Sequence, residues 1–227
     1  MTTSSSRLFY LLAFLFVSTI SQSQNFVIQA EPEIAINIDR PNRWSFNFGI
    51  TNRDLLYFDK TSQFRVNFVE LSHFTSYEVG FYGKLSLGLR YRFNELFEDR
   101  RKDEIRITQQ YSRSRKYNAL KVAHRFRFEQ RIRELTIYRG RYQFSVEYPL
   151  NGERIDRNEY FLVMSAEALW SFTKEEKPEL GQRFDISLGK DIGGGNKADL
   201  GLQYRLEEYN LNSFHGLFLI GGLTISI

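Results

Sequence analysis

Charged side chains recur at every second position along much of the chain, and side chains spaced in this way could act together on a ligand or on one another. Between residues 121 and 129, Lys121, Arg125, Arg127 and Glu129 alternate with mostly apolar neighbours. Side chains two positions apart in a strand share one face, so these charges would lie together. Because a guanidinium stays charged and binds carboxylates through parallel hydrogen bonds, such a face predicts either a structural ion-pair network or a constriction that prefers anions.

The predicted charged face holds more bases than acids, and we expect it to point into the lumen of a barrel. We favour a structural role for it, with anion-biased passage of small solutes as the functional alternative. The residues that we assign to this face are Arg65, Arg90, Arg92, Arg106, Arg125, Arg127, Glu129, Arg131, Arg141, Glu147, Glu167, Arg205 and Glu207.

Hydrolytic chemistry would instead need a nucleophile and a base within hydrogen-bond reach. The chain has only His73, His124 and His215, and His73 directly follows Ser72, so in a strand those two side chains point to opposite faces. We therefore predict no catalytic residue and no enzyme activity, with an outer-membrane lipid-modifying enzyme as an alternative. Without cysteine, and with cations beside the acidic residues of 99–104, we predict no metal and no cofactor.

The first residues predict export of the chain. Arg7 precedes ten apolar residues, 8–17, and Ser21 and Ser23 then supply the small side chains of a cleavage site. An apolar run of this length is too short for a transmembrane helix, which needs about 20 residues. We predict a signal peptide over residues 1–23, cleaved after Ser23, and one mature domain over residues 24–227.

Strict alternation of apolar and polar residues dominates from residue 44 onward and predicts an all-β chain. In 85–93 every position obeys it, and Phe64, Val66 and Phe68 are predicted to share one face. Residues 72–82 stay unplaced, and an extra strand near 34–38 stays open. The ten predicted strands cover about 44–51, 63–71, 83–93, 104–111, 119–131, 137–148, 159–172, 182–190, 198–209 and 215–227.

Alternation does not say which face meets a core, so two architectures compete. The long strands, their even number and the aromatic residues near strand ends favour an antiparallel up-and-down transmembrane β-barrel of about ten strands, within a range of about eight to twelve. The alternative is a soluble periplasmic β-barrel or sandwich that acts as a binding module. The mean hydropathy of −0.42 suggests a soluble protein, but a polar lumen would offset a lipid-facing exterior in that average.

The segment His124–Arg131, together with the strand 87–93 and the early tryptophan strand, resembles a family of small bacterial outer-membrane barrels of unknown function. The resemblance implies a barrel in the outer membrane of a Gram-negative bacterium and supplies no reaction. We expect a porin-like monomer whose partners are outer-membrane lipid and small anionic solutes. A net charge of +4 is too mild to predict nucleic-acid binding.

Overall fold

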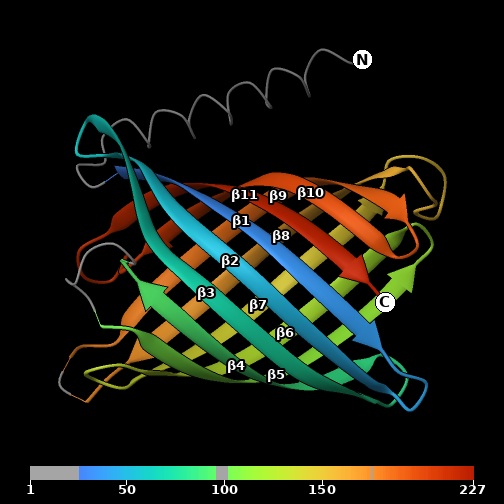
Figure 1. The fold of residues 1–227 in the computed structure, drawn as a ribbon, viewed down its shortest axis with the longest axis horizontal. Coiled ribbons are helices and arrows are strands. Elements are labelled where there is room, and N and C mark those ends of the chain that lie inside the picture. The colour runs from blue at the N-terminus through green and yellow to red at the C-terminus, as the bar shows by residue number, and fades with distance from the viewer. Residues whose placement is uncertain (1–25, 96–101, 175) are drawn as a thin grey trace, which may run out of the picture.

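The computed structural model describes residues 26–95, 102–174 and 176–227, whose strands close into one barrel (Figure 1). This confirms the prediction of an all-β barrel. The predicted signal peptide and part of the connection 94–103 lie outside the described residues. In the part of the chain that is described, no helix is long and apolar enough to cross a membrane. The strands are β1 (Phe26–Asp39), β2 (Trp44–Phe58), β3 (Thr61–Val79), β4 (Gly83–Asn94), β5 (Glu104–Tyr117), β6 (Leu120–Ile132), β7 (Ile137–Pro149), β8 (Tyr160–Phe172), β9 (Glu179–Gly193), β10 (Asn196–Glu207) and β11 (Phe214–Ser226).

The eleven strands lie within the predicted range of eight to twelve, but barrel closure corrects their predicted even number and wholly antiparallel pairing. The segment near 34–38, left open by the sequence, belongs to the 14-residue strand β1, which makes the number of strands odd. In an odd-stranded up-and-down barrel the first and last strands run the same way. Accordingly, β1 pairs with β11 in parallel, and the two lie side by side with their arrowheads at the same end (Figure 1). The barrel is therefore mixed, and the expectation of an even, wholly antiparallel set is wrong.

Several strands extend beyond their predicted ends. β3 continues to Val79 through the unplaced segment 72–82, and β5 continues to Tyr117 through the predicted connection 112–118. The glycine-rich stretch between β9 and β10 becomes a tight turn, because Gly194 and Gly195 both have positive φ, 66° and 81°. Glycine adopts this conformation without the clash that a Cβ would cause.

The polarity of the two faces of the barrel wall is the reverse of that in a soluble protein, because the outer face is apolar and the inner face is charged. Leu87 and Leu200 on the outer face are 59% and 70% exposed, whereas Glu104 and Glu129 on the inner face are 1% and 0% exposed. Most of the fully buried side chains among the described residues are polar or charged. The interior of the described barrel is therefore largely ionic, and most aliphatic groups lie outside, although Val27 and Leu55 are buried.

Aromatic side chains pack on the outer face near both ends of the barrel. Trp170 and Phe172, at the end of β8, have ring centroids 5.8 Å apart. Trp44 and Tyr77 lie where β2 begins and β3 ends, with ring centroids 5.0 Å apart. Because neighbouring strands alternate in direction, these two pairs mark opposite ends. We call the end where the odd-numbered strands begin the vestibule end.

A bulge in β3 changes which side chains point inward. Arg53 pairs with Phe68 while Asp54 pairs with Val66, so Asn67 is the extra residue. One extra residue shifts the alternation to the other face. Phe64 consequently stays outside, 74% exposed, while Phe68 lies in the lumen. The prediction that Phe64, Val66 and Phe68 share a face is wrong for Phe68.

Candidate functional site: the charged lumen

Glu70 on β3 is the centre of one group of ion pairs in the lumen. Its carboxylate accepts hydrogen bonds from Arg92 at 2.6 Å and from Arg90 at 3.2 Å, and Arg106 lies 3.8 Å away. These three arginines come from β4 and β5, whose register places them next to one another. One carboxylate therefore serves three guanidinium groups, of which Arg106 also pairs with Glu104.

Glu104, at the start of β5, forms a second group. Arg131 on β6 donates to both carboxylate oxygens, from Nη2 at 2.8 Å and from Nε at 3.0 and 3.1 Å, and Arg106 donates at 2.6 Å. This forked geometry is the one in which arginine binds a carboxylate most specifically. Glu104 thereby joins β5 to β6 close to the vestibule end.

Glu129 and Glu167 form a third group across β6, β7 and β8. Arg141 bridges them, 3.0 Å from Glu129 and 2.6 Å from Glu167. Arg127 lies 3.5 Å from Glu129, and Arg183 lies 3.9 Å from Glu167. Glu129 is fully buried, so its carboxylate depends on Arg127 and Arg141 for the solvation that water would otherwise provide.

Arginine and phenylalanine side chains alternate along the inner wall between β4 and β10. Phe68 lies between Arg92 and Arg53, whose guanidinium carbons are 3.7 and 4.5 Å from its ring centroid. Phe218 lies between Arg53 and Arg205 in the same way, at 5.2 and 3.6 Å. These are cation–π distances. We call these five residues the Arg–Phe belt; Glu31 completes it with ion pairs to Arg53 and Arg205.

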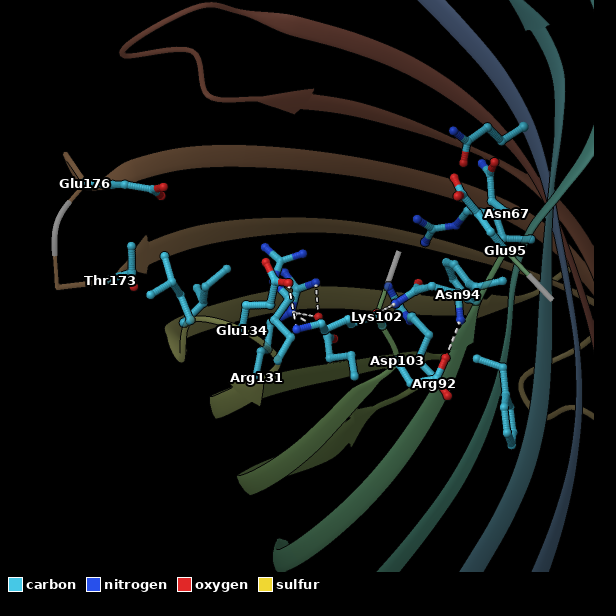
Figure 2. A pocket seen from close by; sticks show the side chains of 18 residues that line it. Asn67, Arg92, Asn94, Glu95, Lys102, Asp103, Arg131, Glu134, Thr173 and Glu176 are labelled. Carbon is cyan, nitrogen blue, oxygen red and sulfur yellow. Dashed lines mark hydrogen bonds and ion pairs between the residues drawn. The ribbon is translucent and has the colours of Figure 1, made fainter. Parts of the chain in front are cut away.

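Two cavities lie on either side of the belt. The vestibule, about 1020 Å³, opens at the vestibule end, where Asn94 at the end of β4 and Lys102 and Glu134 in the connections lie around it (Figure 2). The lumen cavity, about 770 Å³, lies deeper in the barrel. Both are lined by Arg53, Phe68, Arg92 and Arg131. These four residues therefore form the boundary that a solute would cross between the two cavities.

Phe74 supports the arginines on the far side of the lumen. Its ring centroid lies 5.2 Å from the Arg90 guanidinium carbon and 5.8 Å from that of Arg127. The ring lies over Gly88 on β4, where a Cβ would collide with it. Glycine at this position therefore lets an aromatic ring lie flat against the wall.

Replacing Gly88 by alanine is expected to destabilise the barrel by about 1–3 kcal/mol, because the new methyl group displaces Phe74. The measurement is the free energy of unfolding by urea in detergent micelles. The double variant Gly88→Ala with Phe74→Leu should recover part of the loss. Unchanged stability in Gly88→Ala would show that Phe74 does not occupy this position.

The structure brings most of the predicted lumen residues into this network, but not all. Glu147 pairs at 3.2 Å with Lys121, away from the arginines and toward the end opposite the vestibule. Arg65 has no ion pair within the described residues and lines neither of the two cavities. The predicted residues that take part in the ion pairs of this network, with those of Glu31 and Glu207 included, are Arg90, Arg92, Arg106, Arg125, Arg127, Glu129, Arg131, Arg141, Glu167, Arg205 and Glu207.

Several residues of the network are not among those predicted to face the lumen. Glu31 and Arg53 lie in strand regions that the alternation did not cover, and Glu104, at the start of the predicted strand 104–111, was grouped with the charges of 99–104 and not with the lumen face. Glu70 follows the bulge, so simple alternation assigned it to the apolar face. The surplus of arginines over predicted acids was the one signal that further carboxylates were needed.

The three histidines lie among hydroxyl groups of threonine and tyrosine. His73 is 3.0 Å from Thr75 Oγ1, His124 is 2.9 Å from Tyr142 Oη, and His215 is 2.6 Å from Tyr204 Oη. Among the described residues, no group of three or more acidic, histidine or cysteine side chains could hold a metal ion. That the chain is not an enzyme stays a prediction.

Comparison with known proteins gives one family. A family model described as a protein of unknown function, DUF2490, matches residues 32–213, which include most of the barrel. No curated protein matches the chain.

Proposed function

We propose that this chain, which belongs to the DUF2490 family, is an outer-membrane β-barrel whose narrow, arginine-rich lumen passes small anionic solutes. In this proposal residues 1–23 are the signal peptide that directs export, and the mature barrel acts as a monomer. The lipid of the outer membrane surrounds it.

The observation that carries the membrane proposal is the distribution of exposed apolar side chains. On neighbouring strands Met164, Ile186 and Leu202 pair in register on the outer face and are 44%, 49% and 44% exposed. A soluble protein rarely exposes apolar patches of more than a few hundred Å². A lipid environment removes the cost of this exposure, and a closed barrel satisfies the backbone hydrogen bonds that lipid cannot.

The lumen supports an anion preference because arginines outnumber the carboxylates that face them. Glu70, Glu129 and Glu167 each serve two or more arginines. Rings of arginine favour anions in pores. The two cavities provide room for a small solute, which a purely structural, tightly packed network would not need.

Two experiments test this proposal. Cell fractionation is expected to recover the protein in the outer membrane, extractable only with detergent; recovery in the periplasm without detergent would favour a soluble binding module instead. Planar-bilayer recordings of the purified barrel are expected to show conductance with an anion bias. Absence of conductance would leave the lumen with a structural role only.

Truncation of Phe68 is expected to raise the single-channel conductance. Phe68 borders both cavities, so Phe68→Ala widens the boundary between them and frees the side chains of Arg53 and Arg92 that pack against its ring. Phe128→Ala, on the outer face, is the matched control and should leave conductance unchanged. Equal conductance in wild type and Phe68→Ala would exclude the Arg–Phe belt as the narrowest part of the path.

A further inference from the structure

The lumen cavity carries opposite charges on its two sides. Arg90, Arg125 and Arg127 line it from β4 and β6, whereas Glu33 and Asp199 line it from β1 and β10. In the closed order of strands, β6 lies across the barrel from β1. The cavity therefore separates a cationic side from an acidic side.

The carboxylate partners of the cationic side are shared with other arginines. Arg125 has one ion pair, a distant one of 3.7 Å to Glu167, and that carboxylate is already bound by Arg141 at 2.6 Å. Arg90 shares Glu70 with two other arginines, and the Nε atoms of Arg90 and Arg125 are buried without a hydrogen-bond acceptor among the described residues. Because their carboxylate partners are shared, the guanidinium groups that line the cavity keep N–H donors for a ligand rich in oxygen atoms.

Arg127 is held in place for such a ligand. Its Nε and Nη2 donate to Gln110 Oε1 at 3.0 and 2.7 Å, so a neutral amide oxygen receives its strongest hydrogen bonds. Its ion pair to Glu129 is longer, 3.5 Å. The positive charge of Arg127 is thus fixed at the cavity wall, and its carboxylate partner, Glu129, is shared with Arg141.

The two carboxylates of the acidic side are unpaired among the described residues. Glu33 and Asp199 form no ion pair within the described part of the chain. Both are in register with Gly222 on β11, and the Asp199 carboxylate lies over this glycine, where a Cβ would collide with it. Two carboxylates thus lie at neighbouring positions of the lumen wall, and this arrangement is suited to a cationic hydrogen-bond donor.

We propose that the lumen cavity binds a small zwitterion, whose phosphate contacts Arg90, Arg125 and Arg127 and whose ammonium group contacts Glu33 and Asp199. A phosphate offers enough acceptors for three guanidinium groups, and an ammonium group offers three donors to the two carboxylates. The cavity volume of about 770 Å³ lies in the usual range for small-molecule sites. The inference rests on the proposed function, because a solute must enter the lumen to reach this site.

Isothermal titration calorimetry of the mature barrel tests the proposal, with O-phosphoethanolamine, inorganic phosphate and ethanolamine as separate probes. The detergent has a head group that is neither charged nor zwitterionic, so that it does not compete for the site. O-phosphoethanolamine is expected to bind tightest. Arg125→Gln should weaken its binding about tenfold or more, the effect expected for losing a charge-assisted hydrogen-bond pair. Glu33→Gln should reduce its affinity to that of inorganic phosphate. Arg113→Gln, which removes an exposed arginine outside the cavity, is the control and should change nothing.

Each result decides the assignment. Equal affinity for O-phosphoethanolamine and phosphate would overturn the ammonium contact, and binding unaffected by Arg125→Gln would overturn the phosphate contact. No binding of any probe to a barrel that still migrates as folded would overturn the site. The titration needs neither conductance nor a membrane. A barrel that binds the zwitterion but conducts nothing would therefore refute passage and leave the site intact.

Discussion

Replacing Glu129 by glutamine is expected to lower the free energy of unfolding by about 3–5 kcal/mol. The Glu129 carboxylate is fully buried and lies 3.0 Å from Arg141 and 3.5 Å from Arg127. Removing its charge leaves two guanidinium groups in a confined space without their shared counterion. Uncompensated buried charge is more costly than the pair itself is stabilising. Urea unfolding in detergent micelles provides the measurement.

The matched control for Glu129 is an exposed pair of the same chemistry. Lys102 and Glu134 lie 3.0 Å apart, with side chains 74% and 68% exposed. Solvent screens such a pair, so Glu134→Gln should cost less than about 1 kcal/mol. If Glu129→Gln and Glu134→Gln proved equally mild, water would have to reach Glu129 freely, and the lumen would not be the confined ionic network described above.

Introducing arginine at Ile186 is expected to cost about 2–4 kcal/mol in a lipid bilayer. Ile186 lies on the outer face between Met164 and Leu202, its partners on β8 and β10, and is half exposed. In lipid, a charged side chain there loses its hydration. In water, the same substitution at an exposed position would cost almost nothing. Unfolding of the barrel from phospholipid vesicles measures the difference.

The control for Ile186 is an apolar residue outside the strands. Leu211 lies in the connection between β10 and β11 and is 43% exposed, close to the 49% of Ile186. Leu211→Arg should therefore be nearly neutral in the same vesicles. Equal effects of the two substitutions would indicate that the outer face of β9 does not contact the hydrocarbon.

Alternation predicted the strands well where the two faces of the wall meet different environments. Residues 83–93 and 137–148 were predicted within one residue of the ends of β4 and β7. β1 was harder, because Glu31, Pro32 and Glu33 interrupt its pattern. Proline weakens the case for a strand because it cannot donate to the ladder. Here Pro32 lies in the parallel closing pair, opposite Gly221.

The residues of the lumen were only partly predictable, because period two reports a face and not a height or a bulge. Glu70 shares sequence parity with the outward Phe64, and only the bulge at Asn67 turns it inward. Arg65 was predicted in the network, yet it lies beside Leu55 toward the vestibule end, away from the carboxylates. Neither the bulge nor the stagger between strands can be read from the pattern of a single strand.

The most direct test of a membrane barrel is refolding of the urea-unfolded mature chain with phospholipid vesicles, followed by flotation through a density gradient. A membrane barrel is expected to float with the vesicles after an alkaline wash. On gels it is expected to migrate as a compact species that converts to the unfolded one on heating. A chain that folds in buffer without lipid or detergent, and stays at the bottom of the gradient, would contradict this expectation.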